Sequence, residues 1–262
     1  MGQYSKAETE GHLLIVTINR PEVYNALHPM ANQELSDVFD EFAANPELWV
    51  AIITGAGDKA FSAGNDLKYH AELRAKTGGR PHSPAKGFGG LTNRHDLDKP
   101  VIAAVNGVAM GGGFEIALAS DIIVASDRAK FALPEPRVGL AALAGGTHRL
   151  PRAIPLKHAM GMLLTGRRVS AEEGYRLGFV NEVVPAGEAL AGARRWANMI
   201  LECAPLSVRA SKQSAYQGLG KASVEEASRA SYDQVVAMVK SQDFLEGPRA
   251  FAEKRAPVWK GR

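Results

Sequence analysis

The chain has 262 residues, of which 45% are hydrophobic and 23% are charged, a composition that excludes a disordered, fibrous or polytopic membrane protein. Its 31 Lys and Arg residues balance 28 Asp and Glu residues to a net charge of +3, which argues against a nucleic-acid partner. The single cysteine, Cys203, excludes an internal disulfide and a multi-cysteine zinc site, and we expect it to be a packed thiol at a helix end. Because no apolar leader opens the chain, we expect a soluble, cytoplasmic protein without a membrane partner.

The first part of the chain predicts strands that alternate with helices. The apolar, β-branched run 12–19 predicts a strand. Apolar residues at helical spacing over 35–42 predict an amphipathic helix that a proline ends. Residues 49–54 predict a second, buried strand. Glycines, prolines and basic residues crowd residues 70–95, which predicts a long, mobile loop of the kind that covers a site.

Residues 101–126 form the most apolar stretch of the chain and predict a strand, a glycine turn, a short helix and another strand. The stretch is long enough to span a membrane, but Asn106, Glu115 and Asp121 would be costly in lipid. Buried elements of a folded core are therefore the better interpretation.

The second half of the chain predicts mainly helices. Ser170 and Glu173 form a capping box, Pro205 suits the first turn of a helix, and residues 224–240 predict one long helix. Residues 180–184 are the one strand-like interruption. We therefore expect a βα core followed by a helical C-terminal part.

Two glycine turns after buried strands are candidate sites for an anion or an oxyanion. The triplet 111–113 opens a helix, so its backbone N–H groups are unpaired. Gly64 lies in a second turn, which could point another N–H into the same cleft, because adjacent βα turns lie at one edge of a sheet. Both turns also have a structural interpretation: close packing for the triplet, and a helix cap by Asn65 or Asp66 for the second turn.

Two glutamates form a candidate acid–base pair. Glu115 lies in the first turn of an apolar helix, and Glu135 lies between Pro134 and Pro136. Paired carboxylates can divide acid and base roles, because like charges in a low-dielectric site push their pKa values apart. The alternatives are a dipole-stabilised acid for Glu115 and a solvated turn for Glu135. The seven histidines have no metal-ligand spacing, so no metal site is expected.

The chain resembles the crotonase (enoyl-CoA hydratase/isomerase) superfamily through ordered motifs along most of its length. They are Asn19-Arg20-Pro21, FSAGNDL at 61–67, KPVIAAVNG at 99–107, the glycine triplet with Glu115, FALPE at 131–135, GGTHRL at 145–150 and FAEKR at 251–255. The resemblance implies an α/β fold: a crotonase-like spiral of ββα units over residues 1–200, then a helical trimerisation region over residues 201–262. It also implies a homotrimer or a dimer of trimers.

The same resemblance implies an acyl-CoA thioester substrate and no metal or redox cofactor, since coenzyme A is part of the substrate. The N–H groups of Asn65 and Gly112 would hold the thioester oxygen, while Glu115 and Glu135 would act as acid and base in the hydration of a 2-enoyl-CoA. Coenzyme A contacts are implied at Ala26, Ala63, Asn65, Asp66, Leu67, Lys68, Gly112, Phe251 and Lys254, the last two at the mouth of the site, where a neighbouring subunit can supply them.

Several positions depart from the pattern of hydratases. The segment 140–144 lacks the Pro-Gly pair that hydratases commonly carry at Ala142 and Leu143, Arg137 replaces a common apolar residue, and Pro136 stiffens the turn of Glu135. These departures leave open an unusual acyl chain, or an isomerase, racemase, hydrolase or lyase of the same superfamily. An RNA-binding relative is disfavoured by the acidic residues of the early helix, and a scaffold by the presence of both glutamates.

Overall fold

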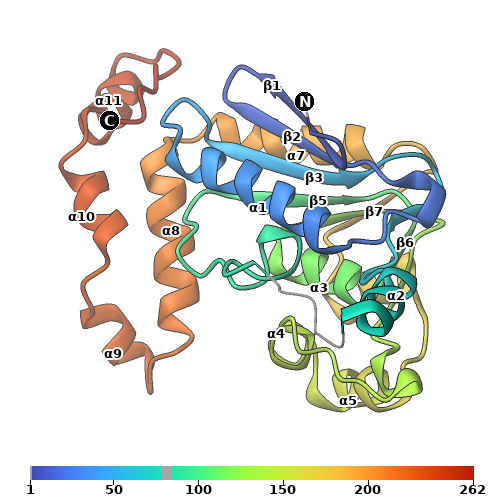
Figure 1. Cartoon of the computed structure of the whole chain (residues 1–262). Coiled ribbons are helices and arrows are strands. Elements are labelled where there is room, and N and C mark those ends of the chain that lie inside the picture. The colour runs from blue at the N-terminus through green and yellow to red at the C-terminus, as the bar shows by residue number, and fades with distance from the viewer. Residues whose placement is uncertain (1, 78–83) are drawn as a thin grey trace.

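The computed structural model describes residues 2–77 and 84–262, which form two β-sheets surrounded by helices (Figure 1). The larger sheet contains, in spatial order, β1 (Ser5–Glu10), β2 (Leu13–Ile18), β3 (Val50–Gly55), β5 (Val101–Val105), β7 (Ile122–Ser126) and β10 (Glu182–Val184). The smaller sheet contains β4 (Ala60–Ser62), β6 (Val108–Met110), β8 (Lys130–Ala132) and β9 (Val169–Ser170). Only the β1–β2 and β8–β9 pairs are antiparallel.

Helices fill the connections between the strands and most of the second half of the described chain. They are α1 (Pro29–Ala44), α2 (Leu67–Thr77), α3 (Gly112–Ala119), α4 (Gly146–Ala153), α5 (Leu156–Thr165), α6 (Ala171–Leu177), α7 (Ala189–Leu201), α8 (Pro205–Gly218), α9 (Val224–Arg229), α10 (Asp233–Val239) and α11 (Gln242–Ala252). Three short 3-10 helices are η1 (Pro21–Val23), η2 (Phe88–Gly90) and η3 (Glu135–Val138).

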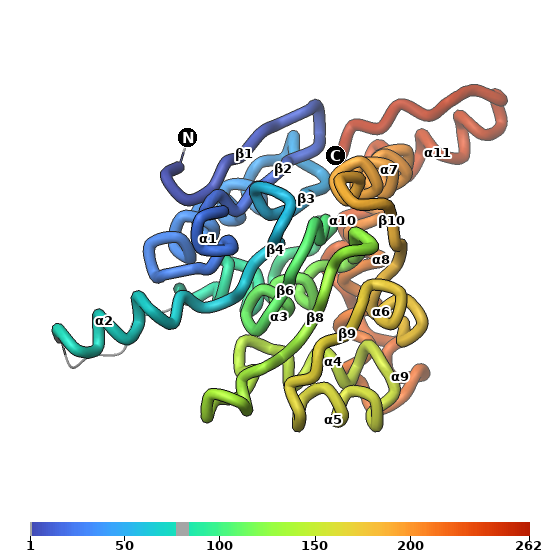
Figure 2. The backbone as a smooth tube through the Cα atoms, turned by 90° about the vertical axis from the view of Figure 1, so that its right-hand side faces the viewer, coloured from blue at the N-terminus to red at the C-terminus, as the bar shows by residue number. Residues whose placement is uncertain are grey.

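From β2 to β7 both faces of the larger sheet are buried, and successive side chains of a strand pack into the core on opposite faces. Leu14 and Val16 of β2 join the core cluster that contains side chains of α1 and α3. Leu13 and Ile15 join a second cluster with the small side chains of α7. Figure 2 shows α1 and α7 on opposite sides of β3. The sheet is thus the central layer against which the remaining elements are positioned.

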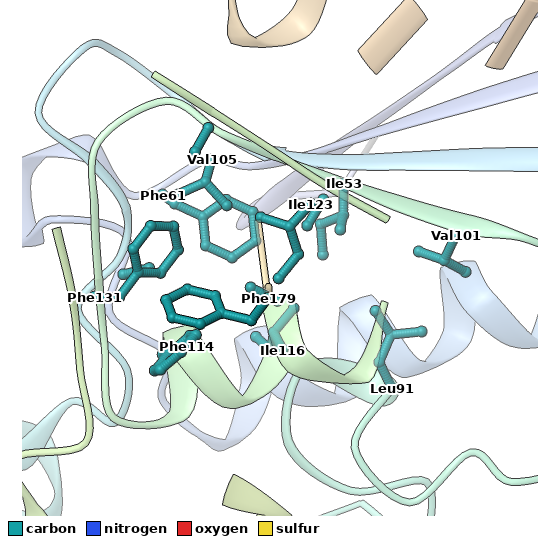
Figure 3. Close-up of a cluster of buried hydrophobic side chains, with 14 of the residues drawn as sticks. Ile53, Phe61, Leu91, Val101, Val105, Phe114, Ile116, Ile123, Phe131 and Phe179 are labelled. Atoms are coloured by element: carbon teal, nitrogen blue, oxygen red, sulfur yellow. The ribbon is translucent and has the colours of Figure 1, made fainter. Parts of the chain in front are cut away.

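An aromatic cluster anchors the start of α3 in this core (Figure 3). Phe114 of α3 lies 5.1 Å from Phe131 and 5.2 Å from Phe179, measured between ring centroids, in tilted contacts. Phe131 and Phe179 pack edge to face at 5.2 Å. Since Phe114 lies between Gly113 and Glu115, these contacts fix the first turn of α3.

Most elements predicted from the apolar patterns are confirmed. The strands expected over 12–19 and 49–54 are β2 and β3. Residues 101–126 contain the expected β5, α3 and β7, and also a strand that was not predicted, β6, before the glycine triplet. The Ser170 side chain accepts the N–H of Glu173 at 3.2 Å, which is one half of the predicted capping box; the Glu173 carboxylate pairs with Arg167 at 2.7 Å. The strand expected at 180–184 is the shorter β10.

The prediction of a mobile loop over residues 70–95 is wrong for most of its described part. Residues 70–77 belong to α2, and residues 78–83 lie outside the described residues. After them the backbone is tightly packed: a Cβ added to Gly90 would lie 2.5 Å from Cα of Ser36 in α1. The glycines here permit close packing, because their positive φ angles and missing side chains let the chain lie against α1 and α3.

Arg94 fixes the same segment to α1. Its guanidinium is buried and donates to the backbone oxygens of Gly90 and Ser36 at 2.8 and 3.1 Å, and to Asp40 at 2.7 Å. Three charge-assisted hydrogen bonds to a single buried side chain hold this segment more firmly than a surface loop is held.

The long helix expected over residues 224–240 is also wrong, because the chain breaks into α9 and α10. Ala230 and Tyr232 are extended between them, with ψ angles of 150° and 124°. Tyr232 turns inward to 9% exposure, and its hydroxyl donates to the backbone oxygen of Ala227 at 2.7 Å. Burial of one aromatic side chain therefore interrupts a sequence that helical periodicity alone would continue.

The helices α9, α10 and α11 stand beside α8, away from the larger sheet (Figure 1). The expected boundary between residues 200 and 201 falls at the end of α7, and the division into two regions stays a prediction.

Cys203 is exposed, so the expectation of a packed thiol is wrong. It follows α7, where no described element covers it. Among the described residues, no helix is long and apolar enough to cross a membrane.

Candidate functional site

The two glycine turns meet at one edge of the smaller sheet, as their positions after β4 and β6 predict. These strands are parallel neighbours, so the turns that follow them lie side by side. A Cβ added to Gly64 would lie 2.5 Å from the oxygen of Met110 and 2.9 Å from the nitrogen of Gly112. A Cβ on Gly113 would lie 2.1 Å from the oxygen of Ser62. Only glycine permits this approach, which brings Asn65 and Gly112 together.

The backbone around Asn65 leaves one N–H unpaired toward the second turn. Leu27 donates its N–H to the oxygen of Gly64 at 2.8 Å, and Asp66 donates to the oxygen of Leu27 at 3.0 Å. In such a bridge the N–H of Asn65 points away from Leu27. Within residues 2–77 and 84–262, the N–H groups of Asn65 and Gly112 donate to no other atom. Two such donors can hold one oxygen that carries negative charge.

Glu115 is a buried carboxyl behind the start of α3, with 4% exposure. Its Oε1 accepts the N–H of Gly146, the first residue of α4, at 2.9 Å. Burial raises the pKa of Glu115 to about 7, and the charge of Glu135 adds to the rise, while the donors at Gly146 and Ala144 and the charge of Arg149 oppose it. The group can therefore gain or lose a proton near neutral pH.

Glu135 begins η3 and faces the glycine triplet from the opposite side. A Cβ added to Gly111 would lie 2.9 Å from its Oε1. Its Oε2 is buried and has no hydrogen-bond partner among the described residues, and burial raises the pKa of the group. A buried carboxyl oxygen without a partner is costly, so its proton or a ligand must compensate. The structure thus brings both predicted glutamates to the glycine turns.

Phe88 is a part of the site that the sequence analysis missed. Its ring lies against Gly112: a Cβ on Gly112 would be 2.5 Å from Cε1 of the ring. The N–H of Phe88 donates to Oγ1 of Thr92 at 2.8 Å, and the ring is half-buried. The signal that could have identified Phe88 is an aromatic residue between Gly87 and the Gly89-Gly90 pair, a pattern that allows the backbone to press against another element.

The segment implied in coenzyme A binding leads away from the N–H groups of Asn65 and Gly112, along the start of α2. Ala63 donates its N–H to Tyr24 at 2.9 Å, and Asp66 caps α2 by accepting the N–H of Tyr69 at 3.1 Å. Arg20 pairs with Asp66 at 3.0 Å and also donates to the oxygen of Ala26. These contacts bring the predicted positions Ala26, Ala63, Asn65 and Asp66 together, and leave Leu67 and Lys68 exposed beside them.

Phe251 and Lys254 do not join the rest of the site within one chain. Phe251 is 87% exposed in α11, and Lys254 follows it. Figures 1 and 2 show α11 and α2 on opposite sides of the molecule. The two residues could therefore contact a ligand at Asn65 only from a second copy of the chain.

The positions that depart from hydratases border the carboxyls. Arg137 turns outward and donates to the oxygen of Thr165 at the end of α5, at 2.8 Å. Leu143 lies between Ala142, which packs on Gly146, and Ala144, whose backbone donates to Glu115. Its side chain is 77% exposed, so this apolar group has no packing partner in the core.

No cluster of three His, Cys, Asp or Glu side chains suited to a metal occurs in the described part of the chain.

Comparison with known proteins identifies the family of the chain. The family model for enoyl-CoA hydratase/isomerase matches residues 8–262. Carnitinyl-CoA dehydratase of Escherichia coli (strain K12) is 48% identical over 256 residues, or 96% of each chain. Enoyl-CoA hydratase of Mycobacterium tuberculosis H37Rv is 38% identical over 100% of both chains, with a TM-score of 0.92. Carnitinyl-CoA hydratase of Mycobacterium avium is 42% identical over 100% of both chains, with a TM-score of 0.77. The chain belongs to the enoyl-CoA hydratase/isomerase family, the crotonase superfamily.

Proposed function

We propose that the protein catalyses the reversible addition of water across the 2,3 double bond of a 2-enoyl-CoA thioester. The observation that carries this proposal is the placement of two carboxyls around the unpaired N–H groups of Asn65 and Gly112: Glu115 is buried, and Glu135 is half-buried with a buried Oε2. Hydration needs one group that deprotonates water, one that protonates carbon, and a holder for the enolate oxygen between them. Acid–base chemistry suffices for this reaction, so we propose no metal or redox cofactor.

The N–H groups of Asn65 and Gly112 would hold the thioester oxygen. That oxygen gains negative charge as water adds to Cβ, so the donors bind the transition state more strongly than the substrate. One donor of this kind contributes about 3 to 4 kcal/mol. The Phe88 ring against Gly112 excludes water from this side of the hole.

The position of each glutamate assigns its role. Cα is bonded to the thioester carbonyl carbon, so it lies nearer to the oxyanion hole than Cβ does. Glu135 touches Gly111, the neighbour of Gly112, whereas Glu115 lies a helical turn further on and faces Gly146. We therefore assign protonation of Cα to Glu135 and deprotonation of the attacking water to Glu115.

The assigned roles require the two carboxyls to hold one proton between them. In the active form for hydration, Glu115 is ionised and held by backbone donors, and Glu135 carries the proton. Because Glu115 titrates at about pH 7, the rate of hydration rises with pH through this range. The charge on Glu115 then opposes ionisation of Glu135, so the two groups titrate as a coupled pair.

The coenzyme A portion would lie along Ala26, Ala63 and the start of α2, where Lys68 supplies a cation for a phosphate. Phe251 and Lys254 would come from a neighbouring subunit. A cytoplasmic location agrees with this reaction and stays a prediction.

The close approach of the two turns predicts the effect of adding one methyl group at Gly64. Gly64→Ala would push the turn of Gly64 away from Met110 and Gly112. It should lower kcat by about 100-fold or more, because the two N–H donors would no longer point at one oxygen. The control is Gly187→Ala, since Gly187 has a φ of +88° against +85° for Gly64 but nothing within 4 Å of its added Cβ. Equal activity of the two variants, assayed as loss of the conjugated thioester absorbance of crotonyl-CoA, would contradict the oxyanion hole.

Separate partial reactions test the roles of the glutamates. Glu115→Gln and Glu135→Gln should each lower hydration of crotonyl-CoA by at least about 100-fold. Exchange of the α-protons of butyryl-CoA with D2O requires no attack at Cβ, so it should survive in Glu115→Gln and be lost in Glu135→Gln. Glu172→Gln, on the exposed face of α6, is the control. Exchange that survives in Glu135→Gln and is lost in Glu115→Gln would reverse the assignment of the two roles. Full hydration activity in either variant would contradict a catalytic role for that glutamate.

The acyl group that we propose carries a quaternary ammonium, as in carnitinyl-CoA. Two observations support it: relatives named carnitinyl-CoA dehydratase are 46–48% identical over nearly the whole chain, and an aromatic face, Phe88, lies at the site. Aromatic rings attract quaternary ammonium groups by about 1 to 2 kcal/mol.

A neutral isostere separates charge from shape in the acyl group. The kcat/KM for crotonobetainyl-CoA should exceed that for 5,5-dimethylhex-2-enoyl-CoA, in which carbon replaces the ammonium nitrogen, by about 10-fold. A ratio of one would contradict the cationic acyl group and leave hydration itself intact.

Mass analysis of the products tests the reaction: a product without added water indicates isomerisation, and release of free coenzyme A indicates hydrolysis or cleavage.

We also propose that the chain assembles as a homotrimer or a dimer of trimers through its C-terminal helices. Large apolar side chains there are left exposed, namely Leu219 at 74%, Val224 at 83%, Leu245 at 72% and Phe251 at 87%. Sedimentation should give about three or six times the chain mass of 28.0 kDa. A monomer that turns over enoyl-CoA at full rate would contradict both the assembly and a subunit-shared coenzyme A site.

A further inference from the structure

Arg149 links two walls of the site that lie on different segments of the chain. It belongs to α4, and its Nη2 donates to the backbone oxygen of Thr92 at 2.8 Å. Its Nη1 lies over Gly145, where an added Cβ would be only 2.0 Å away. The guanidinium therefore spans from the start of α4 to the segment that follows η2.

Each end of this link leads to a group of the proposed reaction. Gly146 follows Gly145 and donates its N–H to Glu115 at 2.9 Å. Thr92, only 1% exposed, accepts the N–H of Phe88 through Oγ1 at 2.8 Å, and the Phe88 ring covers Gly112. A continuous series of contacts thus joins Glu115 to the N–H donor of Gly112. It runs through the turn at 145–146, Arg149, Thr92 and Phe88.

We propose that Arg149 is a positioning residue that holds the Glu115 carboxyl and the Phe88 ring in fixed relation on the two sides of the acyl group. The proposal rests on the hydration reaction argued above. A planar guanidinium suits this place because it presents donors in fixed directions, whereas an ammonium is a single point of charge. Catalysis depends on such fixed geometry, since a displacement of about 1 Å can cost 100-fold in rate.

The charge of Arg149 acts on Glu115 as well. It lowers the pKa of Glu115, against burial and the charge of Glu135 on η3, which raise it. On the other side of Arg149 lies Tyr216 of α8, whose pKa is raised by burial and by Asp121. Tyr216 is neutral at working pH, so Glu115 is the carboxyl whose ionisation depends on the charge of Arg149.

Two substitutions separate the geometric effect from the charge effect. Arg149→Met should lower kcat by about 10-fold or more and move the acidic limb of the pH profile of kcat/KM upward by about half a unit, because a neutral side chain leaves Glu115 harder to ionise. Arg149→Lys keeps the charge, so the acidic limb should stay in place while kcat still falls. KM should change less than kcat in both variants, since Arg149 touches no substrate.

Arg152→Met is the matched control, because Arg152 is exposed on the same helix and, among the described residues, donates only to the backbone oxygen of His148. It should leave kcat and the acidic limb unchanged. If Arg149→Met keeps kcat within about twofold and leaves the limb in place, the proposal is overturned.

A titration without turnover separates this proposal from the proposed function. In protein labelled with 13C-glutamate, the Glu115 signal, assigned by its loss in Glu115→Gln, should titrate at higher pH in Arg149→Met than in the wild type. This result would support the arrangement even if the wild type hydrates no enoyl-CoA. Unchanged titration in a folded Arg149→Met variant would overturn the proposal even if hydration is established. Where the methionine variant does not fold, Arg149→Gln, which also removes the charge, gives the same test.

Discussion

The site depends on a steric constraint, the approach of two backbone turns to a distance that only glycine allows. A Cβ at Gly64 or Gly113 would lie within 2.5 Å of a backbone oxygen of the facing turn. The parallel pairing of β4 and β6 brings the turns to one edge, and their glycines close the remaining distance. Because α3 begins in one turn and α2 in the other, each turn leaves N–H groups without partners. The two unpaired N–H groups of the candidate site are thus a consequence of backbone packing.

The same packing makes the carboxyls costly to ionise and thereby useful. Glu115 is 4% exposed, and an isolated charge at such a place would be strongly disfavoured. The N–H of Gly146 and the charge of Arg149 offset part of this cost, and the balance leaves the pKa at about 7. A group with a pKa near the working pH transfers protons most effectively. The aromatic contacts of Phe114 maintain the balance, because they hold the first turn of α3 at this depth.

Local patterns predicted the parts of this arrangement that local forces determine. Buried strands follow from apolar runs, and the positions of Gly112 and Glu115 follow from the strand, turn and helix around them. Residues 84–94 could not be predicted in this way, because glycines that loosen a loop and glycines that permit tight packing have the same local sequence. Arg94 and Arg149 decide between the two outcomes, because they bind backbone oxygens that are distant in the sequence, those of Ser36 and Thr92. The exposure of Cys203 is likewise a property of which surfaces neighbouring elements cover, not of its own helix.

In the proposed reaction, the groups that do the chemistry and the side chains that border the acyl group lie on separable parts of the fold. The oxyanion donors and the two carboxyls come from the turns after β4 and β6 and from η3, whereas Phe88 and Leu143 come from the segments that border them. Changing a bordering side chain alters the space and charge offered to the acyl group, but it leaves the backbone approach at Gly64 and Gly113 in place. One backbone arrangement can therefore serve substrates as different as neutral enoyl and cationic carnitinyl thioesters. Arg149 marks the limit of this separation, since it ties the Phe88 wall to the turn that holds Glu115, so a change in the wall reaches the acid–base pair through Thr92 and α4.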